Sequence, residues 1–142
     1  MIPTIKWEDN YIYLIDQRKL PNKKEWLACH TVRDVIAAIR EMAIRGAPAI
    51  GVAAGMGLAV GAQSIETENY GLFRERFSEM AEQMKSARPT AVNLKWAVER
   101  MIKIVEGMHG NQVEEIKETI RKESETILER DIEINREIGQ RG

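Results

Sequence analysis

The sequence is poor in the side chains that most often carry out enzyme chemistry. It has one cysteine, Cys29, which cannot form an internal disulfide, and two histidines, His30 and His109, which are too few and too far apart for a metal site. It contains no Gly-x-Ser-x-Gly motif, Walker lysine loop or dinucleotide-binding fingerprint. The residues alone therefore indicate a protein that binds a ligand but has no recognisable pair of catalytic side chains. We interpret Cys29 as a packed residue rather than a nucleophile.

The sequence also lacks a strong net charge, low-complexity tracts and a targeting segment. With 21 basic and 22 acidic residues the formal net charge is −1, which gives no indication of a nucleic-acid or membrane partner. The polar N-terminus shows no signal segment, and together with the lone cysteine this favours a cytoplasmic location. A chain of 142 residues without a Pro- or Ser-rich linker is expected to form one domain.

An uncharged run stands out in this otherwise highly charged chain, because no ionisable residue occurs between Gly46 and Ile65. Its length approaches that of a transmembrane helix, and its position inside the chain excludes a signal peptide. The run contains Pro48 and few large apolar side chains, and it is rich in glycine, at positions 46, 51, 55, 57 and 61. We therefore interpret it as a core helix, from about Pro48 to Gln63, whose small residues let neighbouring helices approach closely.

The N-terminal part, residues 1–30, is predicted to be a small antiparallel β-sheet. Residues 2–7, 11–15 and 26–29 are short segments rich in β-branched and aromatic side chains, and turn residues separate them. A sheet this small needs a helix or a second domain to cover one face. The predicted fold class is α+β, mostly α, with this sheet followed by a bundle of about five helices over residues 31–142.

Helical periodicity predicts the other four helices. The first begins with a capping box at Thr31 and Asp34 and continues to Arg45. After a loop over 66–71, a third helix ends before Pro89, and the fourth opens at 88–90 and stops at Gly107 and Gly110. The fifth is expected from Asn111, with Glu114 at the reciprocal capping position, to about Ile138. It has a narrow apolar seam at positions 113, 120, 127 and 134, so it is expected either to pair through this seam or to bridge to another part of the protein.

Two arginines precede predicted helices that begin with proline. Arg45 lies three residues before Pro48, and Arg88 directly precedes Pro89. Proline suits the first turn of a helix, and the free N–H groups of a helix start bind anions. If the two helix starts converge, they would form a receptor for a phosphate or sugar phosphate. The alternative is that Arg88 is an ordinary surface residue at a helix junction.

Four segments carry a resemblance to a known family. They are Asp-Gln-Arg-Lys-Leu-Pro at 16–21, Arg-Gly-Ala-Pro-Ala-Ile-Gly at 45–51, Ala-Arg-Pro-Thr-Ala-Val-Asn-Leu at 87–94, and Glu-Ile-Asn-Arg at 133–136 followed by Ile-Gly at 138–139. In each of them, and in register over the whole chain, the sequence resembles the S-methyl-5-thioribose-1-phosphate isomerases.

The resemblance implies an aldose–ketose isomerase, an intramolecular oxidoreductase, of the methionine salvage pathway. Its reaction would convert 5-methylthioribose 1-phosphate to 5-methylthioribulose 1-phosphate. Arg45, Gly46, Ala47 and Arg88 match substrate-contacting positions of the family. The resemblance further implies a homodimer, with no metal and no nucleotide cofactor.

The chain departs from the family in its length. Family members have a second, Rossmann-like domain that carries the catalytic cysteine and the acid–base aspartate, and the sequence ends at Gly142, where this domain would begin. Cys29 does not match the catalytic cysteine. We therefore expect the 142 residues to be the N-terminal domain of the isomerase, to contain no catalytic residue and to be inactive alone.

Two alternatives stay open on the sequence. The same fold resembles the regulatory subunits of the guanine-nucleotide exchange factor of eukaryotic translation initiation, which would make the chain a non-catalytic assembly or ligand-sensing module. The intact Arg-Gly-Ala-Pro-Ala-Ile-Gly segment favours the enzyme over this alternative. The other alternative is an isomerase of a different ribose 1-phosphate, because the residues that line a methylthio pocket are not identified by the sequence.

Overall fold

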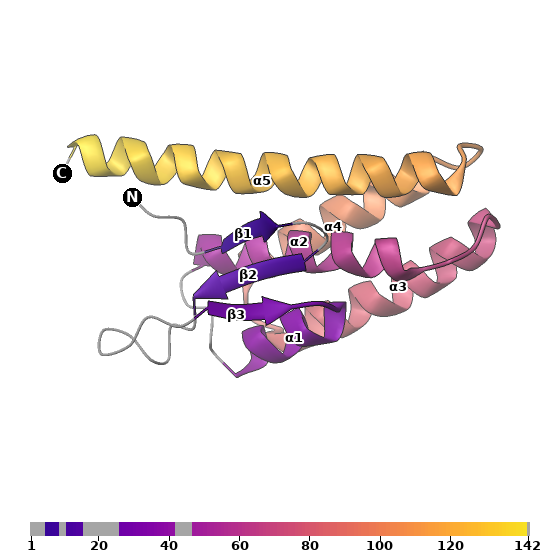
Figure 1. The fold of residues 1–142 in the computed structure, drawn as a ribbon, viewed down its shortest axis with the longest axis horizontal. Helices are drawn as coiled ribbons and strands as arrows, with labels where there is room; N and C mark the ends of the chain where they lie inside the picture. Colours follow the sequence, from indigo (N-terminus) through magenta and orange to yellow (C-terminus); the bar gives the residue numbers. More distant parts are fainter. Residues whose placement is uncertain (1–4, 9–10, 16–25, 42–46, 142) are drawn as a thin grey trace.

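The computed structural model describes residues 5–8, 11–15, 26–41 and 47–141, and the side chains of 12–13, 26–41 and 49–129 within them. These residues form three strands followed by five helices (Figure 1). The elements are β1 (Ile5–Glu8), β2 (Tyr11–Ile15), β3 (Trp26–Cys29), α1 (Val32–Arg40), α2 (Ala47–Ser64), α3 (Tyr70–Ala87), α4 (Val92–Gly107) and α5 (Val113–Arg141). The predicted fold class, a small antiparallel sheet before a helical bundle, is confirmed.

The sheet is antiparallel and has the strand order β1-β2-β3. Trp7 pairs with Ile12 and Ile12 pairs with Cys29, so these three residues lie in one row across the sheet. Ile12 is fully buried and Cys29 is 2% exposed, which identifies the face that packs on the helices. Here β2 contacts α2 and β3 contacts α1, so helices cover one face of the sheet as its small size requires.

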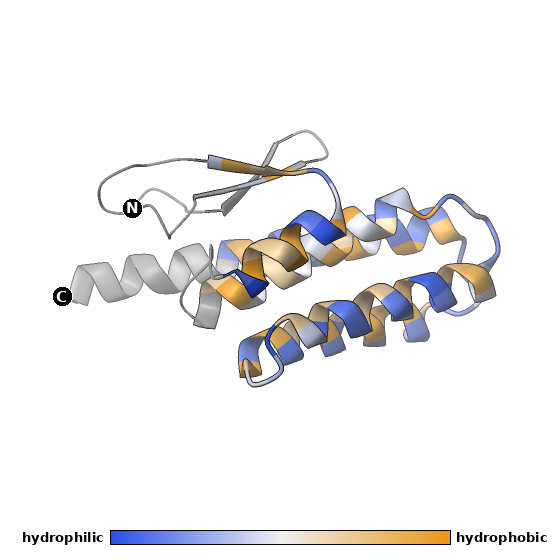
Figure 2. Ribbon diagram, turned by 90° about the horizontal axis from the view of Figure 1, so that it is seen from below, coloured by the Kyte–Doolittle hydropathy of each residue, from blue (hydrophilic) through white to orange (hydrophobic). Residues whose placement is uncertain are grey.

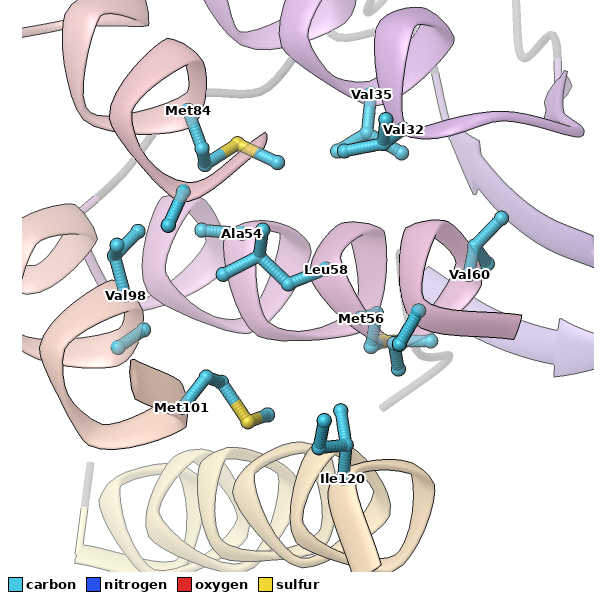
Figure 3. Packing of buried hydrophobic residues seen from close by; sticks show 14 of the residues in the cluster. Val32, Val35, Ala54, Met56, Leu58, Val60, Met84, Val98, Met101 and Ile120 are labelled. Carbon is cyan, nitrogen blue, oxygen red and sulfur yellow. The ribbon is translucent and has the colours of Figure 1, made fainter. Parts of the chain in front are cut away.

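Helix α2 is the centre of the molecule. It contacts α1, α3, α4, α5 and β2, and nearly every side chain described along it is buried. Figure 3 shows Val35 of α1, Met84 of α3, Met101 of α4 and Ile120 of α5 directed toward it from four neighbouring helices. The interpretation of the uncharged run as a core helix is therefore confirmed. None of the described helices combines the length and the apolar character needed to cross a membrane.

Glycines set the close approach of the helices around α2. A Cβ atom added at Gly57 would lie 2.8 Å from Cγ1 of Val35, and one at Gly61 would lie 2.8 Å from Sδ of Met80. Real Cβ contacts are essentially never this short, so α1 and α3 occupy space that any side chain at these positions would need. The surrounding helices are amphipathic, with hydrophobic and hydrophilic residues alternating around their turns (Figure 2).

The predicted start of α1 is confirmed and its predicted end is wrong. Thr31 Oγ1 accepts from the N–H of Asp34 at 3.2 Å, and Asp34 Oδ2 accepts from the N–H of Thr31 at 3.2 Å, which completes the capping box. The helix ends at Arg40, and Glu41 is its C-cap, so the first helix does not continue to Arg45.

Three further helix boundaries differ from the prediction. Helix α3 begins at Tyr70, so Gly71 belongs to this helix and not to the loop. Helix α4 begins at Val92, because the N–H of Ala91 donates to the carbonyl of Arg88 and closes a turn that contains Pro89. Helix α5 begins at Val113 without the predicted Asn111–Glu114 capping box. The Asn111 side chain instead donates to Glu115 at 3.0 Å.

The long helix α5 packs through a narrow apolar seam, as predicted. Its 29 residues span about 43 Å at 1.5 Å per residue. Val113, Ile120 and Ile127 of the seven-residue repeat are buried, as is Ile116 between them, whereas the side chain of Ile134 lies outside the described residues. The helix lies along α2 and α4, which occupy the side that this seam faces (Figure 1).

Candidate functional site

The second turn of α2 lies against the start of α4. In the first turns of α2, a Cβ atom added at Gly51 would be 3.1 Å from the carbonyl oxygen of Asn93, the second residue of α4. One turn further along α2, a Cβ atom at Gly55 would be 3.5 Å from Cε of Met101. Contacts therefore advance in the same direction along both helices, so α2 and α4 run parallel with their N-termini at the same end of the bundle.

The structure describes two of the four residues that the sequence predicts to contact substrate. Ala47 is the first residue of α2, and Arg88 is the C-cap of α3, four residues before α4 begins. Arg45 and Gly46 lie outside the described residues. The two helices expected to carry the anion site thus begin at the same end of the bundle. Only α2 has a proline within its first turn, because Pro89 lies in the turn before α4.

The start of α4 differs from the starts of α1 and α3. Its N-cap is Ala91, which makes no side-chain capping bond, whereas Thr31 caps α1 and Asn69 caps α3 with a bond of 2.9 Å to the N–H of Leu72. The first turns of both α2 and α4 lack an acidic residue, while α5 has Glu114 and Glu115 there. Uncapped N–H groups at the positive end of a helix favour an anion.

Arg88 lines an open pocket of about 240 Å³ at the corner between α3 and α4. Its walls also contain two cationic, three small and one large apolar side chain, namely Lys85 and Lys95, then Ser86, Pro89 and Ala91, and Leu94. Lys85 is 3.8 Å from Glu82 and 4.0 Å from Glu99, which offset its charge. Within the part of the chain that the structure describes, neither Arg88 nor Lys95 forms an ion pair, so both cations are available to a ligand.

Cys29 has the properties of a packed thiol, as the sequence indicated. Burial, and to a smaller extent the negative charge of Asp34, raise the pKa of Cys29 from 9.0 to about 11. The thiolate that a nucleophile requires is therefore disfavoured at neutral pH. Across the described ranges, His, Cys, Asp and Glu side chains do not gather in groups of three or more that could hold a metal ion.

The exposed apolar residues of α4 were not found from the sequence. The predicted apolar face consists of Leu94, Ala97, Val98, Met101, Ile104 and Val105, and all of these are buried except the partly buried Ile104. Val92, Trp96 and the partly buried Ile102 are the apolar residues of α4 outside this face, and the exposed ones are Val92 and Trp96. Their place on the helical wheel, on the side opposite the core, was a signal in the sequence that could have identified them.

Comparison with known proteins supports the resemblance seen in the sequence. The methylthioribose-1-phosphate isomerase of Thermoanaerobacter sp. (strain X514) is 43% identical over 141 residues, which are 99% of this chain and 41% of that protein. The corresponding isomerase of Syntrophobacter fumaroxidans is 41% identical over 141 residues, 99% of this chain and 40% of that protein. The chain thus spans about two fifths of the length of the curated relatives it matches.

Solved structures show the same fold at comparable identity. The crystal structure of 5-methylthioribose 1-phosphate isomerase from Pyrococcus horikoshii OT3 matches with a TM-score of 0.85 and 38% identity, over 89% of this chain and 36% of that one. The translation initiation factor eIF-2B subunit delta from A. fulgidus matches with a TM-score of 0.84 and 38% identity, over 94% of this chain and 38% of that one. Residues 43–142 match the model of the initiation factor 2 subunit family, and the chain belongs to that family.

Proposed function

We propose that this chain supplies the phosphate-binding part of a methylthioribose-1-phosphate isomerase. The observation that carries the proposal is the contact of Gly51 in α2 with Asn93 at the start of α4. Arg88 lines a pocket at the corner between α3 and α4, where the same helix begins. Two helix N-termini and an arginine would bind the sugar phosphate and hold it in one orientation, which is where catalysis by positioning begins. Arg45, Gly46, Ala47 and Arg88 are the proposed substrate-binding residues.

The proton-transfer groups belong, in this proposal, to a second domain that the isomerase family has and these 142 residues do not contain. The proposed active protein is a cytoplasmic homodimer of two-domain subunits. The 142-residue chain alone is expected to bind the phosphate group and to catalyse no isomerisation. Turnover of methylthioribose 1-phosphate by the chain alone, lost on Arg45→Ala substitution, would contradict this division of roles.

Phosphate binding can be tested by titrating the 15N-labelled chain with inorganic phosphate and following the amide signals by NMR. We expect shifts at Ala47, Val92 and Asn93, at the two helix starts. Arg88→Ala should weaken phosphate binding about tenfold, equivalent to about 1.4 kcal/mol, because a charge-assisted hydrogen bond is lost. Arg76→Ala on the exposed surface of α3 is the matched control. Equal weakening by the two substitutions would refute a specific role of Arg88.

A second candidate function is a non-catalytic assembly or ligand-sensing module, and the likeness to eIF-2B subunit delta from A. fulgidus supports the assembly role. An assembly subunit has no need for a sugar-phosphate site at the α2 and α4 starts. Binding of methylthioribose 1-phosphate that depends on Arg88 would therefore favour the isomerase. Absence of shifts at the helix starts with every phosphate tested would favour the assembly subunit.

A further inference from the structure

The first two turns of α4 present an exposed apolar surface formed by Val92 and Trp96. Val92 is 78% exposed and Trp96 is 49% exposed, and among the described residues the other exposed large hydrophobic side chain is Leu72 of α3, at 37%. Residues four apart lie on the same face of a helix, about 6 Å from each other along its axis. The two side chains therefore form one continuous patch that begins at the first residue of α4.

The Trp96 ring contacts Arg100, which lies one turn further from the start of α4. The guanidinium carbon of Arg100 lies 5.4 Å from the centroid of the Trp96 ring, and Arg100 is itself ion-paired with Glu123 of α5. A long side chain on a helix is directed toward the N-terminus of that helix. Trp96 therefore extends from Arg100 toward the turn that contains Val92. The exposed aromatic ring is thus carried by a residue about one turn from the uncapped start of α4.

We propose that Val92 and Trp96 form the subsite for the methylthio group of the substrate, an inference that rests on the proposed function. The substrate has an anionic phosphate at one end and an apolar thioether at the other. The start of α4 offers uncapped N–H groups and Arg88 for the first, and Val92 and Trp96 for the second. Contact with the thioether would remove apolar surface from water and add a favourable sulfur–aromatic contact.

The inference can be tested by NMR with the 142-residue chain labelled at its amides, valine methyl groups and tryptophan indoles. The three probes are methylthioribose 1-phosphate, ribose 1-phosphate and inorganic phosphate. We expect every probe to shift the amide signals of Val92 and Asn93, and only the methylthio compound to shift the Val92 methyl and Trp96 indole signals. The methylthio compound should bind about tenfold more tightly than ribose 1-phosphate.

Substitutions in the patch should reduce this preference. Val92→Thr and Trp96→Ala are expected to bring the affinity ratio of the two sugar phosphates close to one, because the apolar contact is lost. Leu72→Ala, on α3, is the control that should leave the ratio unchanged.

The possible outcomes separate the two proposals. Amide shifts with all three probes, but no preference for the methylthio compound, would overturn the subsite and leave the phosphate site supported. Absence of shifts with any probe would overturn both proposals. If the Val92 and Trp96 signals instead broaden with increasing protein concentration and do not shift when the probes are added, the patch is a surface for self-association. This result would overturn the methylthio subsite.

Discussion

Replacing Gly51 by alanine tests whether the starts of α2 and α4 are in contact. The new Cβ atom would lie 3.1 Å from the carbonyl oxygen of Asn93 and 3.3 Å from the Cβ atom of the same residue. Because the nearest atom belongs to the backbone, the helices must move apart to relieve the contact. Overpacking of this kind costs about 1–3 kcal/mol. Alanine favours the helix over glycine by about 1 kcal/mol, so we expect a net loss of about 0–2 kcal/mol.

Gly55→Ala is the matched control for this substitution. It lies one turn further along α2, and its Cβ atom would meet Cδ1 of Ile127 at 3.3 Å and Cε of Met101 at 3.5 Å. Both of these atoms are the ends of flexible side chains and can move without shifting a helix. The gain in helix propensity is the same, so we expect a change between zero and about 1 kcal/mol of stabilisation. The two variants should therefore differ by up to about 3 kcal/mol, with Gly51→Ala the less stable.

Urea unfolding followed by circular dichroism gives both free energies by linear extrapolation. Phosphate titration of the same samples adds a functional measurement, because a shift of α4 away from α2 separates the two helix starts. We expect Gly51→Ala to weaken phosphate binding and Gly55→Ala to leave it unchanged. A Gly51→Ala protein at least as stable as Gly55→Ala would refute the close approach of α2 and α4.

Three further substitutions test other parts of the fold. Gly57→Ala should destabilise the protein by up to about 2 kcal/mol in urea unfolding, because its Cβ atom would lie 2.8 Å from the stiff side chain of Val35 and overpacking exceeds the gain in helix propensity. Increased stability would contradict the packing of α1 on α2. Thr31→Ala should cost about 1 kcal/mol through loss of the cap, and Thr31→Ser should not. Because the pKa of Cys29 is raised to about 11 in the folded protein, its thiol loses its proton at a lower pH in the unfolded chain. Stability should therefore fall between about pH 9 and 11, and less so in Cys29→Ala; equal pH dependence of the two proteins would refute this.

The order and type of the elements could be predicted because each depends on a local pattern. Strand β3 was predicted with its observed ends, and the capping box of α1 was read directly from Thr31 and Asp34. Helix ends were less predictable where two local structures suit the same residue. Proline is accepted both in the first turn of a helix and in the turn before one, and the bond from Ala91 to Arg88 selects the second at Pro89.

The site depends on contacts between distant parts of the sequence, which local patterns do not specify. The two arginine motifs predict an anion receptor if the α2 and α4 starts converge, and the approach of Gly51 to Asn93 shows that the two helices begin at the same end of the bundle. The exposure of Val92 and Trp96 could have been predicted from the helical wheel. Their possible role in binding a ligand followed only from the observed start of α4 at Val92. Whether Arg45 completes the site stays a prediction, because it lies outside the described residues.

The parallel arrangement of α2 and α4 gives a physical reason for an anion at their starts. Each helix start carries about half a positive charge, so two starts placed side by side repel each other, whereas antiparallel neighbours attract. Neither first turn contains an acidic residue to offset this charge, and Arg88 adds another cation nearby. Gly51 of α2 allows α4 to approach closely at its start. A bound phosphate would interact with both helix starts at once, so its binding should stabilise the fold as well as position a substrate.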